Sequence, residues 1–218
     1  MSNSSIMTSQ GEFFYEPLDL KHGMGRIDKI IAFENLRVTK KIFDKSEIKF
    51  GLMFGTLLGA VRDGDFINWD EDLDLYLFDE QREKLHDALH LLRSEGLELV
   101  RAEGDLYSIM RNGQYIDLYL FRAFGKMRRS LFYEVKSCHL DVMDTIDFRG
   151  LKFNVPSDTE SLLVEFYGRD WRIPQQDKHA LPNTRYQMCL RWLNATSPRA
   201  FSMMRRIKRK VLGRTVEE

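Results

Sequence analysis

The acidic stretch at residues 69–78, WDEDLDLYLF, constrains the fold more than any other part of the sequence. Side chains alternate between the two faces of a strand, so Asp70, Asp72 and Asp74 would share one face while the leucines enter the core. Three carboxylates beside one another repel and resist desolvation. A divalent cation removes that penalty, and oxygen ligands suit Mg²⁺ or Mn²⁺. The stretch therefore predicts a buried strand that carries a metal site.

Two other interpretations of this stretch are possible. The simpler is an acidic turn that leads into an ordinary strand, although such turns rarely continue as Asp-Leu-Asp inside a hydrophobic run. The other is a calcium-binding loop beginning at Asp70. Such a loop requires Gly at its sixth position and Glu at its twelfth, where this chain has Leu75 and Gln81. The calcium loop is therefore excluded.

A second candidate carboxylate, Asp117, lies in the apolar run GQYIDLYLF. An isolated carboxylate in a core strand needs a partner. A neighbouring strand that carries Asp72, Asp74 and a metal would provide one, and a salt bridge to an arginine such as Arg111 or Arg122 is the competing explanation. Both explanations remain open at the level of the sequence.

The pair Gly55-Thr56 stands between a predicted buried strand and a short predicted helix. Gly lets a ligand approach the backbone, and the Thr hydroxyl and the free N–H groups of the helix favour a phosphate. A Thr N-cap after Gly is common, so the pair gains its weight from its position upstream of Asp72 and Asp74. A phosphate cradle followed by paired metal carboxylates is the arrangement that phosphoryl transfer requires.

Periodicity and turn signals predict one α+β fold, a mixed or largely antiparallel sheet flanked by helices and followed by C-terminal helices. The predicted helices cover residues 27–43, 56–63, 80–94 and 158–167, and the predicted strands cover residues 49–54, 73–78, 97–101, 106–110, 114–121, 131–137 and 151–155. Two more helices are expected to complete the chain, the last beginning at Pro198. His86 and His90 stand four apart on a predicted helix without a third ligand nearby, which favours a solvated helix face over a metal pair.

Charge is balanced overall, because Lys+Arg and Asp+Glu both total 33. Net charge therefore predicts no nucleic-acid partner. We expect a flexible, irregular arm over residues 1–20, mobile or loosely docked, a catalytic domain over residues 21–197, and a basic amphipathic helix over residues 198–218. That helix either packs with a solvated basic face or lies on an anionic membrane. Without a signal-peptide pattern or an apolar stretch of bilayer length, we expect a cytoplasmic protein, peripheral to the inner face of the membrane if the helix binds it.

The string GTLLGAVRDGDFINWDEDLDLYL resembles the LicD/fukutin-related family of the nucleotidyltransferase superfamily, whose hallmark reads roughly GTLLGxxRxxxxIPWDxDxD. The later string FRGLKFNVPSDTESLLVEFYGRDWRIP is similar to the closing block of that family. One departure is Asn68, where the family usually has Pro. The order of Gly-Thr, Asp-x-Asp and a later strand Asp is similar to that of the whole superfamily, so the resemblance implies a nucleotidyltransferase-like fold.

Members of this family transfer a phospho-alcohol, such as phosphocholine, ribitol phosphate or glycerol phosphate, from a CDP-activated donor to a glycan hydroxyl, releasing CMP. The resemblance implies the same Mg²⁺- or Mn²⁺-dependent reaction on a surface or capsular glycan, either free or lipid-linked. Asp72, Asp74 and Asp117 would be the metal ligands and catalytic carboxylates, with Gly55 and Thr56 at the donor phosphates. Asp117 would also orient or deprotonate the acceptor hydroxyl.

Other residues are weaker candidates for the same site. Asp70 would orient the metal shell rather than bind metal. Arg62 would clamp a phosphate or lie on the solvated surface. Tyr167, Asp170 and Trp171 would line the donor or acceptor pocket, with a core anchor as the alternative for Trp171.

Two other functions use the same fold. The first is nucleotidyl transfer, in which the attack falls on the α-phosphorus of an NTP and pyrophosphate departs. The second is a binding protein without catalysis, which the presence of all three carboxylates disfavours.

Overall fold

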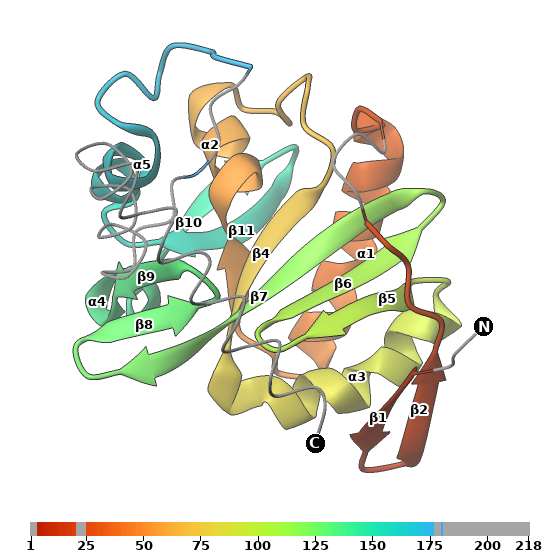
Figure 1. The fold of residues 1–218 in the computed structure, drawn as a ribbon. Helices are drawn as coiled ribbons and strands as arrows, with labels where there is room; N and C mark the ends of the chain where they lie inside the picture. The colour runs from red at the N-terminus through yellow and green to blue at the C-terminus, as the bar shows by residue number, and fades with distance from the viewer. Residues whose placement is uncertain (1–3, 21–24, 177–179, 181–218) are drawn as a thin grey trace, which may run out of the picture. The chain divides into compact units, whose positions relative to one another are not determined.

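The computed structural model describes residues 4–20, 25–176 and 180 (Figure 1). Its centre is a mixed sheet in which β3, β4, β7, β6 and β5 are neighbours in that order, with β8 paired to β7 and β9 paired to β8. The strands are β3 (Phe50–Leu52), β4 (Leu73–Phe78), β5 (Glu98–Glu103), β6 (Leu106–Arg111), β7 (Gln114–Phe124), β8 (Met127–Ser130) and β9 (Tyr133–Lys136). β4 and β7 run parallel, and the other pairs in this sheet are antiparallel.

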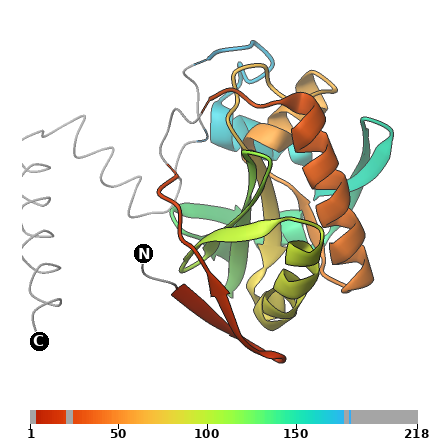
Figure 2. The same ribbon diagram turned by 90° about the vertical axis from the view of Figure 1, so that its right-hand side faces the viewer.

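Helices and two separate hairpins surround the sheet. The helices are α1 (Lys29–Lys45), α2 (Phe54–Arg62), a 3-10 turn at Asp79–Gln81, α3 (Arg82–Ser94), α4 (Ser137–Asp141) and α5 (Thr159–Tyr167). The hairpins are β1 (Ser4–Thr8) with β2 (Gly11–Tyr15), and β10 (Met143–Phe148) with β11 (Leu151–Pro156). Helices α1 and α3 cover one face of the sheet (Figure 2), and α2 lies near β4 and the β10–β11 hairpin (Figure 1).

Strand β4 is the buried centre of this sheet. All six of its residues are buried, because β3 and β7 cover its two edges and other elements cover its faces. Leu73, Leu75 and Leu77 alternate with Asp74 and Tyr76, so the apolar side chains enter the core from one face. The predicted α+β fold, with a mixed sheet flanked by helices, is confirmed, and so is the strand at residues 73–78.

The predicted strand at residues 131–137 corresponds to β9, at residues 133–136, but its first two residues form a tight turn in which Leu131 has a φ of +49°. This turn joins β9 to β8, a strand that the prediction lacks. Leu and Phe at this turn lack the Gly or Asn that marks most positive-φ turns, so the sequence showed no break. Helix α4 and strand β10 are also absent from the prediction.

The prediction of an irregular arm at residues 1–20 is wrong where the structure describes it. Residues 4–15 form the β1–β2 hairpin, and the backbone N–H of Leu18 donates to the carbonyl of Val100 at 2.8 Å. The hairpin contacts α3, because Phe13 is only 1% exposed and packs edge-on against the ring of His90 at 5.0 Å between centroids. The short apolar stretch in this hairpin is stable only through that docking.

The solvated face predicted for His86 and His90 is wrong for the same reason. His86 Nδ1 hydrogen-bonds the carbonyl of Met7 at 3.2 Å, and His90 Nε2 lies 3.2 Å from the hydroxyl of Thr8. These histidines attach the hairpin to α3.

The helices predicted near the C-terminus, including residues 198–218, lie outside the described residues. None of the described helices is long and apolar enough to cross a membrane.

Candidate functional site

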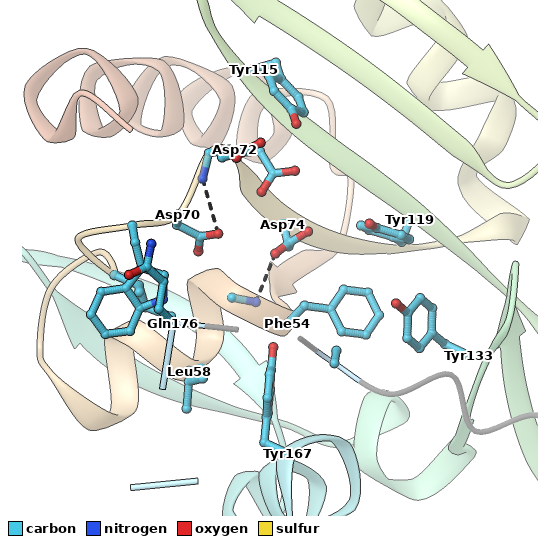
Figure 3. A pocket seen from close by; sticks show the side chains of 15 residues that line it. Phe54, Leu58, Asp70, Asp72, Asp74, Tyr115, Tyr119, Tyr133, Tyr167 and Gln176 are labelled. Atoms are coloured by element: carbon cyan, nitrogen blue, oxygen red, sulfur yellow. Dashed lines mark hydrogen bonds between the residues drawn. The ribbon is translucent and has the colours of Figure 1, made fainter. Parts of the chain in front are cut away.

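A cavity of about 600 Å³ lies beside the start of β4 (Figure 3). Its described lining is acidic and aromatic and contains no Lys or Arg. The lining residues are Phe54, Gly55, Leu58, Ile67, Trp69, Asp70, Glu71, Asp72, Asp74, Tyr115, Tyr119, Tyr133, Tyr167, Gln176 and Ala180. The acidic residues thus meet at one cavity, as the sequence predicts for Asp70, Asp72 and Asp74.

Asp74 is held in place by the turn between β3 and α2. The backbone N–H of Gly55 donates to Oδ2 of Asp74 at 3.0 Å, and the backbone N–H of Asp74 donates to Oγ1 of Thr56 at 2.8 Å. The N–H of Met53 also donates to the Asp74 carbonyl, at 3.0 Å. The Gly-Thr pair therefore orients a carboxylate of the cavity in the structure.

Space near two carboxylates, rather than backbone conformation, favours glycine at position 55. A Cβ atom there would lie 2.5 Å from Oδ2 of Asp70 and 3.3 Å from Oδ2 of Asp74. The two carboxylate oxygens therefore lie so close to Gly55, at the N-terminus of α2, that its hydrogen atom fits between them and a side chain does not. The preceding residue, Phe54, has a φ of +41° and turns the chain sharply into this helix.

The acidic residues of the cavity resist ionisation in the absence of a cation. Burial, together with the charges of Asp117 and Asp70, raises the pKa of Asp72 to about 8. Burial and the neighbouring carboxylates, Asp72 first among them, raise the pKa of Asp74 well above its usual range. Such perturbed carboxylates beside a cavity are typical of functional sites.

Asp117 lies next to Asp74 in the parallel β4–β7 register, but its carboxylate belongs to a different set of contacts. Nη2 of Arg101 donates to both carboxylate oxygens, at 2.8 and 2.7 Å, and the hydroxyl of Ser108 donates to Oδ1 at 2.6 Å. Asp117 is 4% exposed and is not among the residues that line the cavity. Burial raises its pKa, and the Arg101 charge opposes that rise.

The salt bridge offered as an alternative for Asp117 therefore exists, but with a different arginine. Arg111 contacts Asn35, and Arg122 pairs with Asp105.

Four tyrosines bring phenol groups to the cavity from β7, β9 and α5. The hydroxyl of Tyr115 hydrogen-bonds Asp72, and the hydroxyls of Tyr119 and Tyr167 are directed towards the carboxylates (Figure 3). Burial, with the charge of Asp74 next, raises the pKa of Tyr119 and of Tyr167 well above the usual range. These phenols remain protonated and can donate hydrogen bonds to a bound ligand.

Several predicted site residues lie away from the cavity lining. Thr56 is buried, with its hydroxyl turned to the backbone of Asp74 instead of towards a ligand. Arg62 is not part of the described cavity lining and forms a two-point ion pair with Asp63, at 2.9 and 2.7 Å. Trp171 is 2% exposed and belongs to the core, as its alternative interpretation predicts. Asp170 is exposed and accepts a hydrogen bond from the side chain of Gln175.

Sequence reasoning placed Tyr167 at the pocket, which it lines, but missed Tyr115, Tyr119, Tyr133, Arg101 and Ser108. A signal for Tyr115 and Tyr119 was present, because both alternate with Asp117 in YIDLY and so share its face of the strand. No comparable signal marked Arg101, since its partner lies on a strand further along the chain.

The donor set suits a hard divalent cation. Carboxylate oxygens of Asp70, Asp72 and Asp74 line one cavity, and the gap at Gly55 leaves room beside two of them. Among the residues that the structure describes, no three acidic, His or Cys side chains converge as a ready-made metal group. Mg²⁺ usually binds proteins through one or two carboxylates and takes its other ligands from phosphates and water.

The model of the LicD/FKTN/FKRP nucleotidyltransferase domain matches residues 47–158, about half of the chain and the part that contains the site. The chain therefore belongs to this family. The family resemblance that the sequence predicts is thereby confirmed.

Similar proteins include ribitol-5-phosphate transferase FKTN of Macaca fascicularis, 24% identical over 181 residues. That match covers 74% of this chain and 38% of the relative, so the chain corresponds to less than half of the relative's length. Among solved structures, the antibiotic-resistance factor ANT(2'')-Ia has a TM-score of 0.49 at 12% identity, covering 86% of this chain and 97% of that one. A Thermotoga maritima putative nucleotidyltransferase has a TM-score of 0.38 at 18% identity, covering 80% and 99%.

Proposed function

We propose that the chain transfers a phospho-alcohol from a CDP-activated donor to a hydroxyl of a glycan, with release of CMP and dependence on Mg²⁺ or Mn²⁺. The observation that carries the proposal is the acidic cavity, where Asp72 and Asp74 stand beside Gly55 within the part of the chain that matches the family. The name of the fukutin relative, a ribitol-5-phosphate transferase, supports a phosphorylated alcohol as the transferred group.

Asp72 and Asp74 are the residues that would hold the cation, with Asp70 beside them. Burial, and after it the charges of the neighbouring carboxylates, raise the pKa of Asp72 and of Asp74, and the described lining has no Lys or Arg beside them. When bound, the cation would neutralise the donor pyrophosphate and stabilise the departing CMP.

The rest of the reaction is positioning. The oxygen of the acceptor hydroxyl attacks the phosphorus that bears the alcohol, the bond from that phosphorus to the CMP oxygen breaks, and the hydroxyl proton passes to a carboxylate of the cavity. Tyr115, Tyr119 and Tyr167 can donate hydrogen bonds to the donor or the acceptor from the cavity wall. Such fixed donors stabilise a transition state without reorganising when charge develops.

The test is a donor panel with Mg²⁺: CDP-choline, CDP-ribitol, CDP-glycerol, CTP and ATP, each with and without a mixture of glycan acceptors. Products are resolved by mass spectrometry. We expect one CDP-alcohol to yield CMP and a phospho-alcohol-modified glycan. Pyrophosphate from an NTP, with every CDP-alcohol untouched, would instead establish nucleotidyl transfer.

Two double variants make the test specific to the cavity. Asp72→Asn/Asp74→Asn should abolish CMP release, because it removes two carboxylates of the cavity. Asp144→Asn/Asp147→Asn removes two exposed carboxylates of β10 and should react like the unmodified protein. Equal activity in both variants would contradict the proposal.

A further inference from the structure

Arg101, Ser108, Asp117 and Asp74 form one row across four neighbouring strands. In the strand registers, Arg101 stands opposite Ser108, Ser108 opposite Asp117, and Asp117 opposite Asp74. Residues that stand opposite one another in a sheet share a face, so the row leads from Arg101 on β5 to the cavity carboxylate on β4.

A β-bulge puts Arg101 into this row. The β5–β6 register shifts between Leu99 and Arg101, leaving Val100 as the extra residue. Without the shift, Arg101 would stand on the same face as Leu99, which is 1% exposed and belongs to the core. Bulges commonly re-aim a side chain beside a functional site.

Arg101 makes a closed set of contacts with the row. Its Nε donates to the Ser108 hydroxyl at 2.8 Å and its Nη2 donates to both oxygens of Asp117, while the Ser108 hydroxyl donates to Asp117. The side chains of Arg101 and Asp117 are 18% and 5% exposed, so water screens the pair only weakly. The guanidinium of Arg101 therefore contacts Asp117, which stands opposite the cavity residue Asp74 on the neighbouring strand. The described lining of the cavity itself contains no Lys or Arg.

We propose that Arg101 is a positioning residue of this site. It fixes the orientation of Asp117 beside Asp74, and its charge offsets part of the negative charge that attracts a divalent cation. Loss of Arg101 should therefore tighten cation binding while it impairs turnover, a combination that damage to the fold alone does not produce. The expected effect on turnover rests on the proposed function, whereas the expected effect on cation binding does not.

The test is a titration with Mn²⁺ alone, in which electron paramagnetic resonance measures the free ion. Arg101→Met should bind Mn²⁺ about tenfold more tightly, because a nearby positive charge is gone. Arg101→Lys keeps the charge but loses the two-point contact, so its Mn²⁺ affinity should stay within about twofold of the unmodified protein. Both variants should lower kcat for CMP release by about tenfold or more, with a smaller change in KM.

Arg122→Met is the matched control. It removes an arginine from another Arg–Asp pair, that of Arg122 with Asp105, away from the described cavity lining. It should leave both Mn²⁺ affinity and kcat unchanged.

A second pair of variants avoids a buried unpaired carboxylate, which could prevent Arg101→Met from folding. Asp117→Asn should weaken Mn²⁺ binding, and adding Arg101→Met to it should restore the affinity. The proposal is overturned if loss of Arg101 leaves Mn²⁺ binding unchanged or weaker in folded protein. The comparison is made either in the unmodified protein or in the Asp117→Asn variant. If no donor in the panel reacts, the proposed function fails while the Mn²⁺ comparisons still decide the role of Arg101.

Discussion

Gly55 and Asp74 meet through a single hydrogen bond, 3.0 Å from the backbone N–H of Gly55 to Oδ2 of Asp74. The bond joins the first turn of α2 to the central strand β4, and the absence of a side chain on Gly55 leaves space for the Asp70 carboxylate beside it. The N–H of Gly55 thus orients Asp74, and its missing side chain makes room for Asp70. Replacing Gly55 should therefore affect cation binding in the cavity more than the stability of the fold.

Gly55→Ala should lower Mn²⁺ affinity by about tenfold, because its Cβ displaces the carboxylate of Asp70. Stability should be unchanged or slightly higher, since Ala is favoured over Gly in a helix by about 1 kcal/mol. Mn²⁺ titration and thermal unfolding measure the two effects. In an Asp70→Ala background the same substitution should change affinity much less. Normal Mn²⁺ affinity in the single variant would contradict the steric argument.

Thr56→Val should destabilise the protein by about 1–3 kcal/mol, because it leaves the buried N–H of Asp74 without its acceptor. Thr56→Ser keeps the hydroxyl and should cost about 1 kcal/mol, the loss of one buried methyl group. Urea unfolding of the two variants gives the comparison. Equal stabilities for Val and Ser at this position would show that the hydrogen bond contributes little.

The metal-free protein should become less stable as pH rises from about 4 to about 8. An Asp of the unfolded chain loses its proton near pH 4, whereas Asp72 in the fold keeps its proton to about pH 8. The folded state therefore binds more protons in this window, and stability falls as they leave. Thermal unfolding in chelator at several pH values measures the slope.

Saturating Mg²⁺ should flatten this pH dependence, because the cation replaces the protons between the carboxylates. Asp72→Asn/Asp74→Asn should flatten it without Mg²⁺. A metal-free protein whose stability rises through the same window would refute this account of the cluster.

Phe13→Ala should release the N-terminal hairpin from α3. Phe13 is 1% exposed, and loss of a buried Phe typically costs about 3–5 kcal/mol. Limited proteolysis read by mass spectrometry should show faster cleavage within residues 4–20. Phe14→Ala is the matched control, because Phe14 is 52% exposed on the same strand and should leave cleavage unchanged. Similar cleavage of both variants would argue against docking through Phe13.

The central strand was predictable because two independent patterns agree at β4. Its residues are apolar and β-prone, which predicts the location of the strand, and the spacing of Asp72, just before the strand, and Asp74, within it, predicts that both reach the same cavity. Local patterns of this kind depend on neighbouring residues alone.

The role of Thr56 was not predictable to the same degree. A Thr near the start of a helix makes a hydroxyl available, but the sequence does not reveal whether that hydroxyl contacts a ligand or the backbone of a strand. The structure turns it to Asp74, because β3 and β4 are paired and bring that N–H within 2.8 Å.

Arg101 shows a second limit. Strict alternation from Leu97 and Leu99 places Arg101 on the core face, and only the bulge at Val100 reverses this. A bulge depends on the match between two strands, so the sequence of one strand does not reveal it. The N-terminal hairpin was missed similarly, because its burial comes from contact with α3.

The parallel pairing of β4 and β7 also has a consequence for how the molecule is made. Two adjacent parallel strands cannot be joined by a tight turn, and here α3, β5 and β6 intervene along the chain. Asp74 and Asp117 therefore meet only after a long loop has closed, a slow, non-local step in folding. An intermediate with β4 formed and β7 still free would hold Asp70, Asp72 and Asp74 but would lack Asp117 and the tyrosines of β7 beside them.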